Sequence, residues 1–183
     1  MSLETATLIA AIVAAGASII ALFVGLLAGR AAESRAAHRQ LLAPDLSQIS
    51  EVIYSTVACS KILIEAKTEP AVGNWRARAE AAKERLKAIR VKLRYPLWGI
   101  TDPMNTLTRL PDWIEHARPL DPEHGKRIFA AGKALAWWLD ETVRKSYLAG
   151  RPPSVAQRLI VNFHSWRLDR AYDRMKTTRN AAA

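Results

Sequence analysis

Residues 5–29 read TATLIAAIVAAGASIIALFVGLLAG, and these 25 residues contain no charged side chain. A membrane-spanning helix needs about 20 mostly apolar residues, because each residue adds about 1.5 Å along the helix axis. A helix also pairs every backbone N–H and C=O internally, where a bilayer offers no water. The stretch therefore predicts one transmembrane helix and divides the chain into a membrane segment and a remainder.

A cleaved signal peptide is the alternative interpretation of this stretch. Such a peptide has basic residues before an apolar core of about 7–15 residues. The first five residues, MSLET, contain one acid and no base, and the apolar core that follows is much longer. The sequence therefore favours an uncleaved anchor.

The charges beside the apolar stretch predict its orientation. Arg30, Arg35 and Arg39 follow the stretch, and no Lys or Arg precedes it. Cytoplasmic flanks of membrane helices carry an excess of Lys and Arg. We therefore expect an anchor with its juxtamembrane extension at residues 1–42 in the inner (plasma) membrane, a short N-terminus outside and a cytoplasmic C-terminal domain. Cys59, the only cysteine, is compatible with that reducing compartment.

Small residues recur at every fourth position of the apolar stretch. Small side chains let the backbones of membrane helices approach closely, so this spacing is typical of helices that associate. An Ala-rich stretch also produces the spacing by chance, and both interpretations stay open. If the spacing is functional, the chain forms a homo-oligomer through the stripe Ala17, Ala21, Gly25 and Gly29.

The remainder of the chain is basic and carries helical patterns. The 183 residues include 27 Lys and Arg against 17 Asp and Glu, a net charge of +10; because Glu4 is the only charge among the first 29 residues, the remainder carries +11. Apolar residues recur at spacings of three and four, without the alternation of a strand. We expect an all-α fold, in which a single transmembrane helix precedes a compact basic helical bundle at residues 43–178 and a frayed tail at residues 179–183.

Prolines and glycines predict where the helices begin and end. Glu69, Pro70 and Gly73 are expected to separate the helix of residues 44–67 from the helix of residues 75–95. Gly150 is expected to end the long helix of residues 121–149. The expected helices after the anchor cover residues 44–67, 75–95, short pieces within 102–118, 121–149 and 155–176. The six tryptophans are expected to serve as core and loop anchors. For Trp98, in a loop flanked by proline and glycine, contact with lipid headgroups is the alternative interpretation.

The expected third helix carries a narrow apolar seam on an otherwise charged cylinder. Its spacing of four and three residues is that of a helix that packs along one line. The seam packs inside the domain or, in a scaffold protein, against another helical protein. It comprises Trp75, Ala79, Ala82, Leu86, Ile89 and Leu93. On the last helix, Leu159, Phe163 and Trp166 share one side.

Basic residues form two clusters that predict phosphate binding. Eight Lys and Arg against two Glu lie in residues 76–94, and six against two Asp lie in residues 158–179. Such faces attract the phosphates of RNA or of anionic lipid, and a solvated helix surface beside a membrane has the same composition. The candidate phosphate-binding residues are Arg76, Arg78, Lys83, Arg85, Lys87, Arg90, Lys92, Arg94, Arg167, Arg170 and Arg174.

No motif in the sequence predicts a cofactor or a metal. The chain has no phosphate-binding P-loop, no dinucleotide fingerprint and no serine nucleophile elbow. Four histidines, among them His116 and His124, lack the spacing of a zinc site. We therefore expect no metal and no small-molecule cofactor, and Cys59 is expected to be an inert core thiol.

Residues 158–164 read RLIVNFH and place an Arg and a His six positions apart. An Arg followed by His at this spacing resembles the element of HEPN-type RNases, in which the His moves a proton and the Arg stabilises charge on the scissile phosphate. Leu159 follows Arg158 where HEPN motifs often have a polar residue. Six residues on one helix place two side chains about 120° apart, so two chains together would aim them better than one.

The order of segments extends this resemblance. One N-terminal membrane helix, a small basic helical body and the late pair Arg158 and His164 resemble the small HEPN-like membrane accessory proteins of RNA-targeting (type VI) CRISPR systems. That resemblance implies an antiviral defence protein that assembles in the membrane as a pore-like oligomer. The functional alternatives are then a non-enzymatic binding or effector protein with RNA or a cytoplasmic protein as partner, a tethered RNase, and a helical scaffold.

Overall fold

The structure is a computed structural model that describes residues 3–65, 69–93, 97–117 and 122–182, with side chains for residues 15–65, 72–93, 97–117 and 123–177. Every regular element in these residues is helical, so the predicted all-α class is confirmed there. The order is α1 (Leu3–Leu42), a short 3₁₀ turn (Ala43–Asp45), α2 (Leu46–Glu65), α3 (Glu69–Lys92), α4 (Thr101–Thr108), α5 (Leu110–Ala117), α6 (Pro122–Ala149) and α7 (Val155–Ala182).

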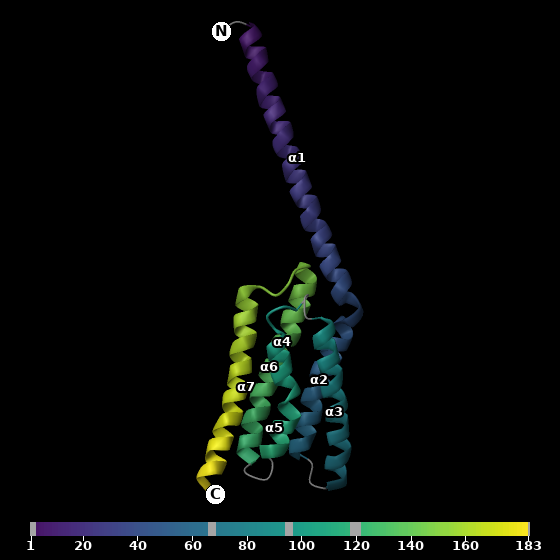
Figure 1. Ribbon diagram of the computed structural model, residues 1–183, viewed down its shortest axis with the longest axis vertical. Coiled ribbons are helices and arrows are strands. Elements are labelled where there is room, and N and C mark those ends of the chain that lie inside the picture. The colour runs from purple at the N-terminus through teal and green to yellow at the C-terminus, as the bar shows by residue number, and fades with distance from the viewer. Residues whose placement is uncertain (1–2, 66–68, 94–96, 118–121, 183) are drawn as a thin grey trace.

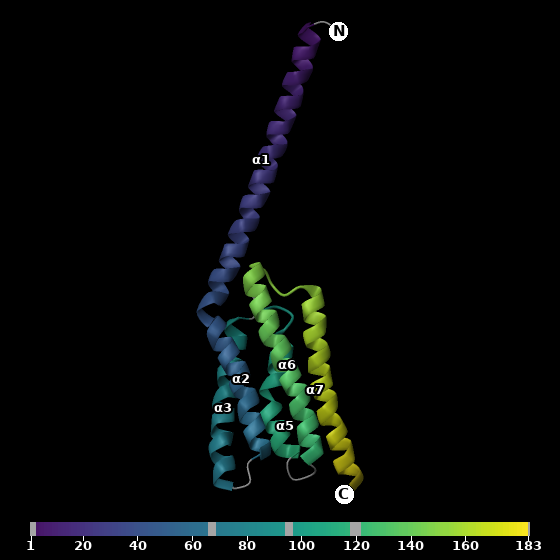
Figure 2. The same ribbon diagram turned by 180° about the vertical axis from the view of Figure 1, so that it is seen from behind.

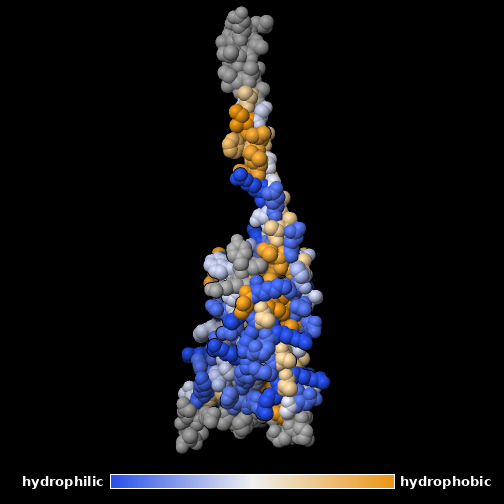
Figure 3. Space-filling view, turned by 45° about the vertical axis from the view of Figure 1, so that its right-hand side comes forward, coloured by the Kyte–Doolittle hydropathy of each residue, from blue (hydrophilic) through white to orange (hydrophobic). Residues whose placement is uncertain are grey.

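Helices α2 to α7 pack side by side, and α1 leaves one end of this bundle (Figures 1 and 2). In both views α1 leans toward the side on which α6 and α7 lie. Within the described residues, α1 is the helix whose length and composition suffice to cross a membrane. Figure 3 shows its apolar part giving way to hydrophilic residues as it approaches the bundle.

The end of α1 is fixed to the end of α6 by three contacts. His38 Nε2 lies 3.1 Å from Ser146 Oγ, and Ser146 gives its own proton to the Arg151 carbonyl oxygen at 2.5 Å. The His38 Nε2–H is therefore the donor of that pair. The Arg39 guanidinium donates to the Leu148 carbonyl oxygen at 2.7 Å. Gly150 provides the third contact.

Gly150 ends α6 with a left-handed φ of 62°, as its position in the sequence predicts. A Cβ at this position would lie 2.7 Å from Arg35 Cβ and 2.8 Å from the Arg35 carbonyl oxygen. The absence of a side chain thus lets the backbones of α1 and α6 meet.

Helix α3 begins earlier than the sequence pattern predicts. It starts at Glu69 and passes through Pro70 and Gly73, which we expected to break it. Proline is tolerated in the first turn of a helix, because the N–H groups of that turn have no acceptor within the helix and the absence of one breaks no hydrogen bond. Helix α7 also continues to Ala182 and so includes most of the expected tail at residues 179–183.

The seam of α3 is part of the core of this chain. Leu86 is fully buried, Ala79, Ala82, Ile89 and Leu93 are buried, and Trp75 packs against the same core. Helix α3 makes its main contacts with α2, whose Ile49 and Ile53 are also fully buried. The seam is therefore not an open surface for a partner helix.

Three of the six tryptophans are exposed, and so is the apolar side of α7 that the sequence groups together. Trp113 is buried, but Trp98, Trp137 and Trp166 are 63%, 50% and 56% exposed, so half of the expected anchors face outward. On α7 the exposed side carries Leu159, Phe163 and Trp166, and the core side carries Val161, Leu168 and Met175. The buried residues follow a seven-residue spacing, which the larger apolar residues on the other side obscure in the sequence.

Replacing Leu86 with alanine tests whether the seam is core. We expect Leu86→Ala to lower the free energy of unfolding by about 2–5 kcal/mol, the usual cost of a cavity in a packed core. Val91→Ala on the same helix is the control, because Val91 is 69% exposed and its truncation should change stability by at most about 0.5 kcal/mol. Urea unfolding of the full-length protein in detergent, followed by tryptophan fluorescence, measures both. Equal stability of the two variants would contradict the assignment.

A second prediction concerns the junction between α1 and α6. Gly150→Ala forces a side chain into a left-handed position against Arg35, so we expect a loss of more than about 1 kcal/mol. Gly73→Ala is the matched control, because Gly73 is an exposed residue of α3 and an added Cβ would meet nothing within 4 Å. Alanine there should raise the free energy of unfolding by about 0.5–1 kcal/mol. The same unfolding measurement reports both, because all six tryptophans lie beyond α1. A Gly150→Ala protein as stable as wild type would show that the close contact is unimportant.

Candidate functional site

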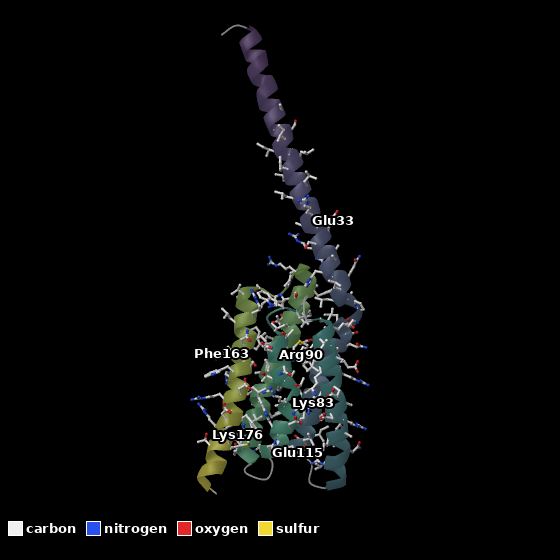
Figure 4. All side chains as sticks on the ribbon, in the orientation of Figure 1. Glu33, Lys83, Arg90, Glu115, Phe163 and Lys176 are labelled. Carbon is white, nitrogen blue, oxygen red and sulfur yellow. The ribbon has the colours of Figure 1, made fainter. Side chains whose placement is uncertain are left out.

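The basic cluster of α3 is largely paired with acids of the same chain. Lys83 donates to Asp112 of α5 and to Glu80, each at 3.0 Å, and Figure 4 shows its position on α3. Arg76 pairs with Glu115, which Figure 4 labels near the opposite end of the bundle from α1. The remaining pairs are Lys87 with Glu84 at 2.6 Å and Lys92 with Asp45 at 2.8 Å.

Three other predicted residues of this cluster have different surroundings. The Arg78 guanidinium lies 4.6 Å from the ring of Trp75, a cation–π contact. Arg85 and Arg90 make no ion pair with a described residue. Arg94 lies outside the described residues. The α3 cluster therefore stabilises its own domain more than it offers charge to a ligand.

The basic residues of α7 instead line a groove against α6. Arg167, Arg170 and Arg174 follow one another at spacings of three and four, which places them on one face of α7. Arg127 of α6 lies across from them, and the groove has a volume of about 410 Å³. Its other lining residues are His124, Ala130, Ala131, Ala134, Trp166, Ala171 and Met175.

Alanines create the space and arginines give it charge. Four of the lining residues are alanines, whose small side chains leave space between α6 and α7 unfilled. None of the lining residues in the described part of the chain is Asp or Glu. Neither Arg127 nor Arg170 has an ion pair with a described residue. Like charges around one open groove attract an anion.

Two aromatic rings lie next to this basic groove. Trp166 lines it and is 56% exposed, and Phe163 one turn earlier is 53% exposed. Their ring centroids are 6.0 Å apart at an interplanar angle of 29°. The Arg167 guanidinium lies 5.9 Å from the Phe163 ring, which joins the aromatic pair to the arginines. Figure 4 labels Phe163 on α7 at the edge of the bundle.

Arg158 and His164 are held by different neighbours. The Arg158 guanidinium lies 4.4 Å from the ring of Trp98, in the turn before α4. The His164 ring stacks on Trp138 of α6 with centroids 5.7 Å apart. The two side chains thus rest against different aromatic rings, and RNA cleavage by this pair, which two chains together would aim better than one, stays a prediction.

The residues predicted for membrane-helix association are free of contacts within one chain. Ala17, Ala21, Gly25 and Gly29 are all exposed on α1, and an added Cβ on either glycine meets nothing within 4 Å. Self-association through this stripe stays a prediction. The described residues contain no group of three or more His, Cys, Asp or Glu arranged to hold a metal ion.

Sequence reasoning missed the α6 half of the groove. Arg127 and His124 belong to neither basic cluster, because Lys, Arg, Asp and Glu are mixed along α6. The available signal was the run of small residues at positions 130, 131 and 134, one turn after Arg127. Small residues at that spacing form one open face of a helix. Comparison with protein-family models, with curated proteins and with solved structures gives no match to this chain.

The stacked position of His164 predicts a pH dependence. Burial lowers the pKa of His164, and the charge of Arg167 lowers it further. The unfolded chain binds this proton near the ordinary value of about 6.5, so the stability given by the neutral ring is complete above that pH and is lost as the pH falls through the lowered folded pKa. We expect the stability advantage of wild type over His164→Gln to shrink between about pH 7.5 and about pH 5. The same difference in free energy of unfolding between the two proteins at both pH values would contradict this prediction.

Proposed function

We propose that this protein is a membrane-anchored, non-enzymatic binder of single-stranded RNA, with the binding site in the groove between α6 and α7. The observation that carries the proposal is the groove itself: four arginines line it, none of its described lining residues is a carboxylate, and the Phe163–Trp166 pair lies beside it. Proteins that bind single strands combine a positive groove along the backbone with aromatic rings on which bases stack. Both parts are present here on one surface.

The spacing of the arginines supports a chain of phosphates as the ligand. Arg167 and Arg174 are seven residues apart on α7, which is about 10 Å along the helix axis, with Arg170 between them. A row of charges on this scale meets successive phosphates of an extended strand, and Trp166 lies at the start of the row. Stacking of one base on an aromatic ring contributes about 1–3 kcal/mol.

The anchor supports RNA as the nucleic acid. The flanking Arg30, Arg35 and Arg39 favour a cytoplasmic bundle on a helix that crosses the inner membrane. RNA is the abundant single strand of that compartment. Association of several copies through α1 would place several grooves on one strand and raise the avidity without a new contact.

Paired neutralising variants test the binding site. The double variant Arg127→Gln and Arg170→Gln removes two groove charges, and Arg85→Gln with Arg90→Gln removes two charges of α3 that have no ion pair with a described residue. Both doubles have the same net charge. The measurement is binding of a fluorescent polyuridine oligomer to the full-length protein in phosphatidylcholine nanodiscs. We expect the groove variant to lose at least about tenfold in affinity, because a hydrogen bond to a charged group contributes about 1.5–3 kcal/mol.

The salt dependence separates site binding from general attraction. Each lost phosphate contact should reduce the slope of log affinity against log salt by about 0.7 for a single strand. Because the groove variant lacks two arginines, we expect its slope to decrease by about twice this amount. The α3 variant should keep the wild-type slope. Equal losses in the two doubles, or no binding by wild type, would overturn the proposal.

A further inference from the structure

Exposed apolar side chains gather at the end of the bundle from which α1 leaves. Trp98, Leu148 and Val155 are each 63% exposed, and they belong to the turn before α4, the last turn of α6 and the first turn of α7. The connection between α6 and α7 lies at this end in Figures 1 and 2. Leu41 at the end of α1 and Val91 at the end of α3 are also exposed.

The described residues at the opposite end of the bundle include no such exposed side chain. Among the described residues there, large apolar side chains are buried or half-buried, and the exposed side chains are polar, charged or small. These residues are 60–65, 72–80, 110–117, 123–135 and 168–177. Exposed apolar groups that gather at one end of a domain, and are missing from the described residues of the other end, indicate a contact surface.

The charge of this end matches an anionic partner. Residues 142–168 contain no Asp or Glu. Arg151 is exposed in the connection between α6 and α7, and the Arg158 guanidinium lies 4.4 Å from the Trp98 ring. Tryptophan together with Lys or Arg is the composition found at the boundary between a bilayer and water.

The length of α1 sets how far this end is from the bilayer. The contact between Arg35 and Gly150 lies six residues, or about 9 Å, beyond the apolar stretch that ends at Gly29. The headgroup layer of one leaflet is about 5–7 Å thick, the difference between the whole bilayer and its hydrocarbon core. Since α1 leans toward α6 and α7, a helix that stands upright in the membrane tips the start of α7 toward the lipid (Figures 1 and 2).

We infer that the end of the bundle formed by Trp98, Leu148, Arg151 and Val155 lies on the anionic lipid headgroups of the leaflet from which α1 emerges. This inference rests on the proposed anchor and not on RNA binding. The bilayer would then hold α1 and the bundle in one orientation, with the arginine groove in the half of the domain farther from the membrane.

Spin labels at three positions of the full-length protein test this contact. Single cysteines replace Val155, Lys176 and Phe23, and native Cys59 stays unlabelled because it is buried. Lys176 is the control on the same helix, 21 residues farther from the membrane, and Phe23 reports whether α1 crosses it. Each labelled protein is placed in nanodiscs of phosphatidylcholine and phosphatidylglycerol, and its accessibility to oxygen and to a water-soluble nickel chelate is measured.

Lipid contact raises access to oxygen and lowers access to the chelate. We expect the label at Val155 to be several-fold less accessible to the chelate than the label at Lys176, with oxygen access at least as high. Equal chelate access at Val155 and Lys176, with Phe23 shielded, would overturn the inference and leave the anchor intact. Low access of Val155 to both reagents would also overturn it, because protein and not lipid would then cover the site. A Phe23 label in water would overturn the anchor and this inference together.

Discussion

The contact between the backbone of α1 at Arg35 and Gly150 at the end of α6 is the constraint on which the rest of the arrangement depends. Without a side chain at position 150, the two helices meet closely enough for His38 to reach Ser146 and for Arg39 to reach the Leu148 carbonyl. These contacts join the end of α1 to the end of α6. In the proposed topology, this junction decides which end of the bundle faces the membrane.

The distribution of ion pairs gives the two basic clusters different roles. On α3, Lys83 and Arg76 are engaged by acids of α5, so their charge helps to hold the domain together. On α7, Arg170 faces a groove whose lining contains no acid in the described residues. The net charge of the chain is the same in either case, but the second arrangement gathers charge at one groove where a ligand can meet it. Counting charges along the sequence cannot make this distinction, because Asp112 and Glu115, which pair with Lys83 and Arg76, lie on another helix.

Much of the fold could be predicted from the sequence, and the exceptions have physical causes. The all-helical class, the end of α6 at Gly150 and the buried face of α3 follow from local spacing and from residues with special backbone preferences. Pro70 was read as a break, although the first turn of a helix accepts proline. The outward face of α7 was hidden because its largest apolar residues, Phe163 and Trp166, are exposed. The site was predicted only in part: Arg167, Arg170 and Arg174 came from the sequence, whereas Arg127 required knowledge of which helix packs against α7.

Photocrosslinking to RNA tests the central claim most directly. The full-length protein in phosphatidylcholine nanodiscs is irradiated with an oligomer that contains 4-thiouridine, and the crosslinked residues are mapped by mass spectrometry. If the groove between α6 and α7 binds the strand, crosslinks concentrate on Trp166 and Phe163, the rings beside its arginines. Crosslinks on α3 near Arg85, or none above the level of a competitor-treated sample, would contradict the account.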